Sequence, residues 1–237
     1  MGWVARTIAL ALAGFAALAP VAVRATPPPT VIFATQPGKP AFDGDDFGGN
    51  PFASAFIAAL GEGVGDDRAT LTEMTLALSG GEQQPDLTSA SGGLELGAAA
   101  RAIALVIVFA DYGDSSDGFG SLPGAAFDAV RVRSALALAG YRAKLAVVAD
   151  RKAYLMRVAK FARETRRADR ALLYTTGHGM GVAGKTWLLP PGFDAADRAS
   201  SLAPRSIGVD TLGSLLHARK SNLIVYAGCR DNPMKLD

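Results

Sequence analysis

Four short apolar segments alternate with three amphipathic stretches between residues 102 and 229, and this alternation limits the possible folds more than any other feature. The first segment, "AIALVIVFA" (102–110), is continuously apolar, which is typical of a strand buried on both faces of a parallel sheet. The others are "YRAKLAVVAD" (141–150), "DRALLYTTGHG" (169–179) and "SNLIVYAGC" (221–229). Parallel strands need long crossover connections. The pattern therefore predicts an α/β fold, a three-layer α/β/α sandwich around a mostly parallel sheet.

The amphipathic stretches predict the crossover helices. They are expected at 125–140, 151–168 and 209–219, with Asp150 as the N-cap of the second. Before residue 100, the pattern predicts a strand at 30–35, a helix at 51–61 that Asn50 caps, a helix at 66–81, and a short strand within "GLELG" (93–97).

Composition and charge fit one globular domain. Hydrophobic residues make up 49% of the 237 residues and charged residues 19%, which suffices for one substantial core. The 24 basic and 22 acidic residues nearly cancel, and no block of Lys and Arg resembles a nucleic-acid patch, so no nucleic-acid partner is expected. The charges of the basic helix at 151–168 are most simply those of a solvated face, and the alternative is a weakly basic surface that helps docking.

The first 25 residues have the pattern of a secretory signal peptide. Arg6 precedes an apolar stretch that Pro20 interrupts, and small residues lead to a cleavage site near Ala25. The stretch is short for a bilayer span. A secreted or periplasmic protein without stable membrane insertion after cleavage is therefore expected, and an uncleaved anchor is the alternative.

Two apolar strands end in residues with acid–base or nucleophilic chemistry. The third strand delivers His178, and the fourth delivers Cys229, the one cysteine of the chain. Reacting groups gather at the carboxyl ends of parallel strands, and neighbouring strands are about 4.8 Å apart. An imidazole there promotes formation of the thiolate, and Gly179 leaves room for a substrate whose oxyanion its N–H and that of Cys229 bind. The alternative is an inert, buried cysteine.

Other chemistries fit the sequence poorly. Two histidines and one cysteine would leave a zinc site dependent on carboxylates, so no metal is expected. The loop "GFGSLPG" (118–124) lacks the spacing of a dinucleotide-binding fingerprint, and no cofactor is expected. His217 lies near the predicted end of a helix and has no expected catalytic role.

Two motifs resemble those of the caspase-like cysteine peptidases. The stretches "ALLYTTGHGMGVAGKTWLLP" and "NLIVYAGCRDNP" look like the histidine and cysteine motifs of that family, in its metacaspase-related bacterial branch. Cys229 follows His178 by 51 positions (229 − 178), which fits this family's spacing. The resemblance covers residues 101–233. It implies a mostly parallel six-stranded sheet, Cys229 as nucleophile and His178 as acid and base.

The order of the segments differs from that family. Residues 101–237 look like its large-subunit part, and residues 26–100 look like the small-subunit part that should follow, with "VIFATQPGKPAFDGDDFGGNPFASAFIAAL" carrying the likeness. The two parts are expected to form one domain. A circular permutation explains this order, and a truncated gene or a remnant of two tandem domains is the alternative.

Departures from the family affect the expected substrate. Ala227 replaces an aspartate that helps metacaspases bind a basic P1 side chain, whereas Asp43 can supply an acidic group to the same S1 site. The resemblance thus implies an endopeptidase that acts on peptide or protein substrates. The alternative is an inactive caspase-homology domain that serves as a binding or scaffold module. The oligomeric state stays open.

Overall fold

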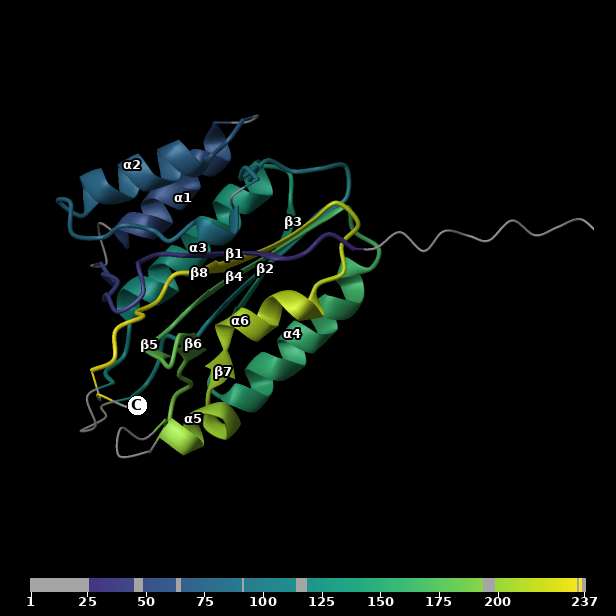
Figure 1. Cartoon of the computed structure of the whole chain (residues 1–237). Coiled ribbons are helices and arrows are strands. Elements are labelled where there is room, and N and C mark those ends of the chain that lie inside the picture. Colours follow the sequence, from purple (N-terminus) through teal and green to yellow (C-terminus); the bar gives the residue numbers. More distant parts are fainter. Residues whose placement is uncertain are drawn as a thin grey trace, which may run out of the picture.

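The computed structural model describes residues 26–44, 49–62, 65–90, 92–113, 119–193, 199–233 and 235, and the predicted signal peptide lies outside them. Five parallel strands form the central sheet in the order β1-β8-β4-β2-β3 (Figure 1). Their bounds are Thr30–Phe33 (β1), Ala102–Val108 (β2), Arg142–Val147 (β3), Arg170–Thr176 (β4) and Ser221–Tyr226 (β8).

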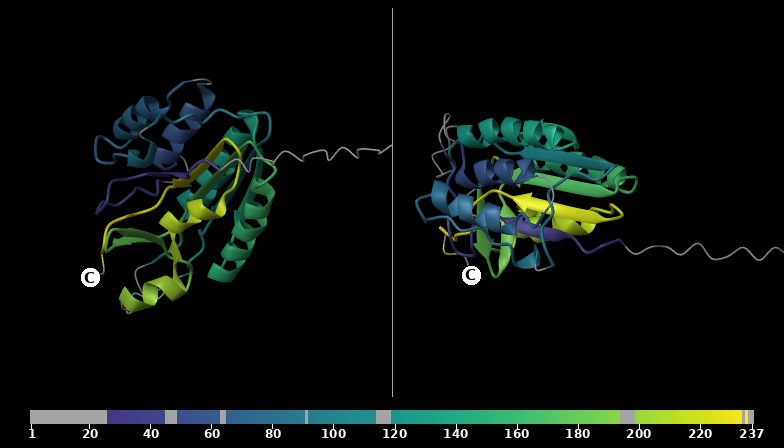
Figure 2. Two further views of the ribbon diagram at one scale, coloured as in Figure 1. Left: turned by 45° about the vertical axis from the view of Figure 1, so that its right-hand side comes forward. Right: turned by 90° about the horizontal axis from the view of Figure 1, so that it is seen from above.

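Helices cover both faces of the sheet, as Figures 1 and 2 show. One face carries α1 (Pro51–Gly61), α2 (Arg68–Leu78) and α3 (Pro123–Leu138), and the other carries α4 (Arg151–Thr165) and α6 (Val209–Leu212). Every residue of β2 is buried, and its side chains alternate between the two layers. The α/β fold and its three layers are therefore confirmed.

Two helices begin where the sequence predicts. The Asn50 side chain accepts hydrogen bonds from the backbone N–H groups of Phe52 and Ala53, at 2.8 and 3.3 Å, and Pro51 is the first residue of α1. The Asp150 carboxylate accepts from the N–H of Ala153 at 2.7 Å and caps α4. These caps satisfy N–H groups that the first helical turn leaves without partners.

The expected sixth strand is not present in the described part of the sheet. The "GLELG" segment instead lies against the start of α2, where the Asp67 carboxylate accepts from the N–H of Leu96 at 2.6 Å. On the outer side of β1, away from β8, the described pairing is one bridge between Phe33 and Asp86. The Ser89 hydroxyl takes up the backbone of Val31 there, because it accepts from the N–H and donates to the carbonyl. The β1 edge is thus covered by a loop and a 3-10 turn, Thr88–Ala90.

The sequence also missed a small second sheet. It consists of β5 (Gly179–Val182), β6 (Lys185–Leu188) and β7 (Ile207–Gly208), and α5 (Ala199–Arg205) precedes β7. The turn between β5 and β6 is Ala183-Gly184, with φ of 49° and 71°, a weaker signal than the usual Asn-Gly. The helix expected at 209–219 is shorter, since α6 passes into a 3-10 turn, Gly213–Leu215.

The segment before residue 100 packs onto the rest of the chain. β1 is parallel to β8, with Thr30 opposite Leu223. On the helical layer, the Asp128 carboxylate of α3 accepts a hydrogen bond from the N–H of Asn50 at 2.7 Å. Gly49 has φ of +68°, a left-handed backbone conformation that favours glycine, and a Cβ there would displace the Arg131 guanidinium. No helix in the described ranges is long and apolar enough to span a membrane.

Candidate active site

The two predicted reactive residues follow adjacent strands. β4 and β8 are parallel neighbours, with Thr175 opposite Tyr226. His178 comes two residues after β4, and Cys229 three residues after β8. Both residues therefore lie at the carboxyl edge of the sheet, as the sequence predicts.

Three groups fix the backbone and ring of His178. Its backbone N–H donates to the hydroxyl of Tyr112 at 2.8 Å, and that buried hydroxyl donates to the carbonyl of Leu189 at 2.7 Å. The ring Nε2 lies 2.7 Å from the carbonyl oxygen of Gly120. The rings of Tyr112 and Phe119 contact the imidazole, with centroids 4.5 and 5.1 Å away.

The Gly120 contact selects the tautomer of His178. A carbonyl oxygen only accepts hydrogen bonds, so Nε2 carries the proton and Nδ1 keeps its lone pair. Burial lowers the pKa of His178, and the bond to Gly120 only partly opposes this effect. At pH 7 the ring is therefore neutral and able to accept a proton at Nδ1.

The Cys229 thiol contacts the segment that follows β1. Its Sγ accepts from the N–H of Ala41 at 3.3 Å and donates to the carbonyl of Ala41 at 3.5 Å. Burial raises the pKa of the thiol, the Ala41 N–H lowers it, and the carboxylates of Asp231 and Asp43 raise it further. The raised pKa of Cys229 favours the protonated thiol over the thiolate at pH 7.

Thiol and imidazole each have other partners in this structure. Among the hydrogen bonds of the described residues, none joins Cys229 Sγ to the ring of His178. A neutral thiol and a neutral imidazole can still act together when the sulfur attacks an electrophile, because Nδ1 then takes the proton that leaves the sulfur.

Gly179 allows the closest approach between the two motifs. A Cβ at this position would lie 1.7 Å from the hydroxyl of Tyr226 and 2.8 Å from the carbonyl oxygen of Cys229. The N–H of Gly181 donates to Asp231 at 2.9 Å, away from β6. Since backbone groups alternate along a strand, the N–H of Gly179 points to the same side, toward the segment that holds Cys229.

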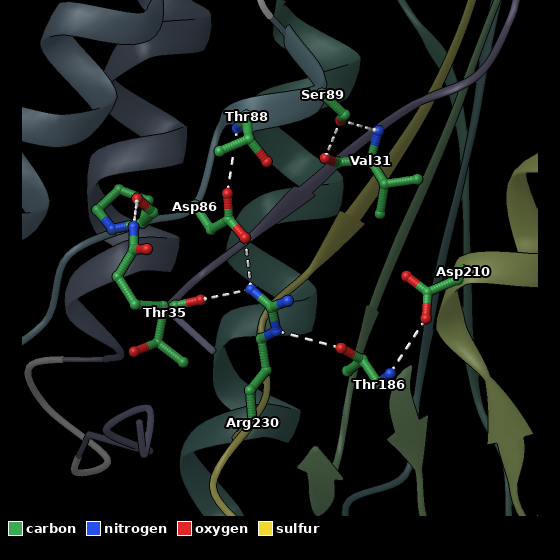
Figure 3. A network of polar contacts seen from close by, with 10 residues as sticks. Val31, Thr35, Asp86, Thr88, Ser89, Thr186, Asp210 and Arg230 are labelled. Carbon is green, nitrogen blue, oxygen red and sulfur yellow. Dashed lines mark hydrogen bonds and ion pairs between the residues drawn. The ribbon is translucent and has the colours of Figure 1, made fainter. Parts of the chain in front are cut away.

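Arg230 anchors the segment that carries the thiol (Figure 3). Its buried guanidinium donates to Asp86 at 2.7 Å, to the carbonyl of Thr35 at 3.1 Å, and to the hydroxyl of Thr186 at 3.1 Å. It also lies 3.8 Å from the ring centroid of Phe33. The residue after the cysteine therefore ties β8 to β1, to the loop beside it and to β6.

The two predicted substrate-binding residues have different surroundings. Ala227 is 5% exposed and belongs to the core beneath α1 and α3, and its N–H donates to Thr175 at 2.9 Å. Asp43 is half-buried, and its carboxylate raises the pKa of Cys229. Of the two residues, Asp43 is therefore the one whose charge affects the thiol of Cys229.

Sequence reasoning missed three groups that surround His178 and Cys229. The tyrosine at 112 follows the first core strand and carries a hydroxyl, which is a usable signal. Gly120 and Ala41 act through backbone atoms, so their side chains gave no signal.

His217 lies away from the site, and its N–H donates to the hydroxyl of Thr165 at 2.9 Å. Within the described ranges, no group of three or more His, Cys, Asp or Glu residues is placed to hold a metal ion.

Comparison with known proteins gives the family. A family model described as a caspase domain matches residues 101–234, more than half of the chain. The chain belongs to the caspase domain family. The match includes all strands from β2 to β8 and both His178 and Cys229, whereas β1, α1 and α2 lie outside it. No curated protein matches this caspase-domain chain.

Proposed function

We propose that this chain is a cysteine endopeptidase in which Cys229 is the nucleophile and His178 the acid and base. The observation that carries the proposal is the bond from His178 Nε2–H to the carbonyl of Gly120. It leaves Nδ1 as the basic nitrogen at the edge where β4 and β8 end.

The proposed reaction proceeds through an acyl-enzyme. As Sγ of Cys229 bonds to the scissile carbonyl carbon, its proton passes to Nδ1 of His178. The oxyanion accepts hydrogen bonds from the N–H groups of Gly179 and Cys229. The imidazolium then protonates the leaving amine, and the C–N bond breaks. Water, deprotonated by Nδ1, hydrolyses the thioester and restores the thiol.

In the resting state, the backbone of Ala41 holds the thiol of Cys229. Its N–H and carbonyl both bond the thiol, so the sulfur must leave these contacts before it attacks a substrate. We infer that substrate binding moves the 39–44 segment off the sulfur. Asp43, two residues further on, then supplies an acidic group for a basic P1 side chain.

We further propose that the chain is a circular permutation within the metacaspase-related branch, with residues 26–100 as the small-subunit part in the same domain. The parallel pairing of β1 with β8 supports this arrangement, because a strand that normally follows the cysteine motif would extend the sheet at that edge. Residues 97–101 join the two parts. The signal-like residues 1–25 support export to the periplasm or outside the cell.

An inactive scaffold is the second candidate. The raised pKa of Cys229 and the apolar Ala227 favour it, because a protonated thiol reacts slowly and an alanine binds no basic side chain. In this case the edge where β4 and β8 end would hold a peptide without cleaving it.

A peptide library separates the two candidates. The full chain is incubated with a mixed peptide library, and new termini are identified by mass spectrometry, with Cys229→Ala as the control. The peptidase proposal predicts cleavage after Arg or Lys, none with the control, and a weaker basic preference in Asp43→Asn. Binding of peptides without any Cys229-dependent cleavage would establish the scaffold instead.

A further inference from the structure

A basic groove runs along the free edge of β3, away from the dyad. It consists of two clefts of about 800 and 420 Å³ that share Lys160 and Glu164 of α4. The larger cleft reaches the amino end of β2, and the smaller one follows Ala143 to Ala146 along β3. Figure 1 shows β3 at the edge of the sheet, with α3 and α4 on its two sides.

The cations of this groove exceed its carboxylates. Glu164 is held by Lys144, with the ammonium nitrogen 2.7 Å from Oε1, and Arg101 bonds Asp169. Six further cations line the groove and have no carboxylate within ion-pair distance in the described ranges: Arg133, Arg142, Arg157, Lys160, Arg163 and Arg167. The whole chain has a net charge of only +2, so this positive charge is local.

The backbone of β3 offers unpaired hydrogen-bonding groups in the groove. Among the strands of the described residues, β3 pairs with β2 alone, and the N–H of Val148 donates to the carbonyl of Val108 at 3.0 Å. Because backbone groups alternate, Leu145 and Val147 direct their N–H and C=O groups outward. Their side chains are 38% and 56% exposed.

The two faces of this edge differ in chemistry. The side chain of Lys144 bonds Glu164 and so faces α4, which carries three of the six cations, whereas Arg133 belongs to α3. Leu145 and Val147, one and three positions after Lys144 on the strand, face the α3 side. A strand added here would therefore place alternate side chains beside cations and beside apolar groups.

We propose that the groove binds an extended acidic segment of another protein, in which acidic and apolar residues alternate, as an additional strand on β3. Charge complementarity and the open backbone both select this occupant. A second copy of the chain would bring like charges together, since the same cations would line both edges. A nucleic acid would satisfy the cations and leave the amides and apolar positions unused.

The test uses a fluorescent octapeptide that alternates glutamate and valine, and the full chain with Cys229→Ala to keep the peptide intact. Binding is measured by anisotropy at about 0.05 M salt, where screening is weak. The groove variant is Arg142→Glu with Lys160→Glu, and the matched control is Lys152→Glu with Arg166→Glu, two cations that line neither cleft. Two N-methylated peptides, one methylated on the glutamate amides and one on the valine amides, test strand addition.

The proposal predicts affinity at least about tenfold lower in the groove variant and unchanged within about twofold in the control. One methylated peptide should bind like the parent and the other should lose binding, since alternate amides point to opposite edges. Equal binding of both methylated peptides, or equally tight binding of polyphosphate, would show a general polyanion surface and overturn the proposal. Absence of binding would also overturn the proposal, because the charges would then serve only to prevent other strands from pairing with the β3 edge. Neither result bears on the peptidase proposal, because the assay needs no catalysis.

Discussion

At the scale of single residues, backbone atoms determine the chemistry of the site. The carbonyl of Gly120 assigns the proton of His178 to Nε2, and the backbone of Ala41 holds the Cys229 thiol at both its donor and its acceptor side. Both side chains are neutral at pH 7, because burial penalises their charged forms. The proposed dyad therefore rests as a thiol with an imidazole and not as an ion pair.

The pH dependence of thiol labelling tests this resting state. Iodoacetamide reacts with the thiolate, so the labelling rate of Cys229 should rise with a midpoint above the ordinary value of about 8.5. Asp231→Asn removes a carboxylate that raises the pKa of Cys229, and the midpoint should move to lower pH. Glu73→Gln, an exposed change on α2, is the control and should leave the midpoint unchanged. A wild-type midpoint well below 8.5 would contradict the neutral resting state.

At the scale of elements, the ion pair between Arg230 and Asp86 joins segments that are far apart in the sequence. Both side chains are buried, at 10% and 8% exposure. Burial alone raises the pKa of the Asp86 carboxyl, but the hydrogen bonds from Arg230 and Thr88 outweigh it, and the pKa lies below its ordinary value. The pair thus stabilises the fold above the ordinary pKa of Asp86, and this contribution is lost as the pH falls through the lowered value.

Removal of one partner should be costly. Asp86→Asn leaves the Arg230 charge buried without a counter-ion, and the free energy of unfolding should fall by about 3 kcal/mol at pH 7. The loss of stability on acidification should also become smaller in this variant. Glu164→Gln, which breaks the more exposed pair with Lys144, should cost at most about 1 kcal/mol. Urea unfolding measures both, and equal small losses would disprove a structural role for the buried pair.

At the scale of the whole molecule, the sequence predicted what depends on local pattern. Apolar runs and N-cap residues such as Asn50 and Asp150 located the parallel strands and the helices between them. The β5-β6 hairpin was not predicted because its Ala-Gly turn is a weak signal. The expected sixth strand is not part of the described sheet, and on the outer side of β1 the Ser89 hydroxyl bonds the backbone of Val31. The contacts of Gly120 and Ala41 are made by backbone atoms of segments distant in sequence. Every residue type carries these atoms, so the sequence could not predict the contacts.

A permuted variant tests the proposed origin of the segment order. Residues 26 and 235 lie at opposite ends of the sheet, because β1 and β8 are parallel, so they are joined by a flexible linker of about 30 residues with an r.m.s. end-to-end distance of roughly 30 Å. The chain is opened between Ala99 and Ala100. Ala100 is exposed, and all pairing of β1 with β8 is kept. The variant should fold with the same circular dichroism spectrum and a similar urea midpoint. A chain that stays unfolded would argue for the truncated or tandem origin.

The most direct test of the dyad is the rate at which Cys229 is labelled by a peptidyl acyloxymethyl ketone with Arg at P1. Wild type is compared with His178→Ala and with His217→Ala, the other histidine of the chain, by intact-mass spectrometry at pH 7. If Nδ1 of His178 takes the thiol proton, labelling should slow by about 100-fold or more in His178→Ala and stay unchanged in His217→Ala. Equal rates in the wild type and in both variants would contradict the account, because the sulfur would then react without the imidazole.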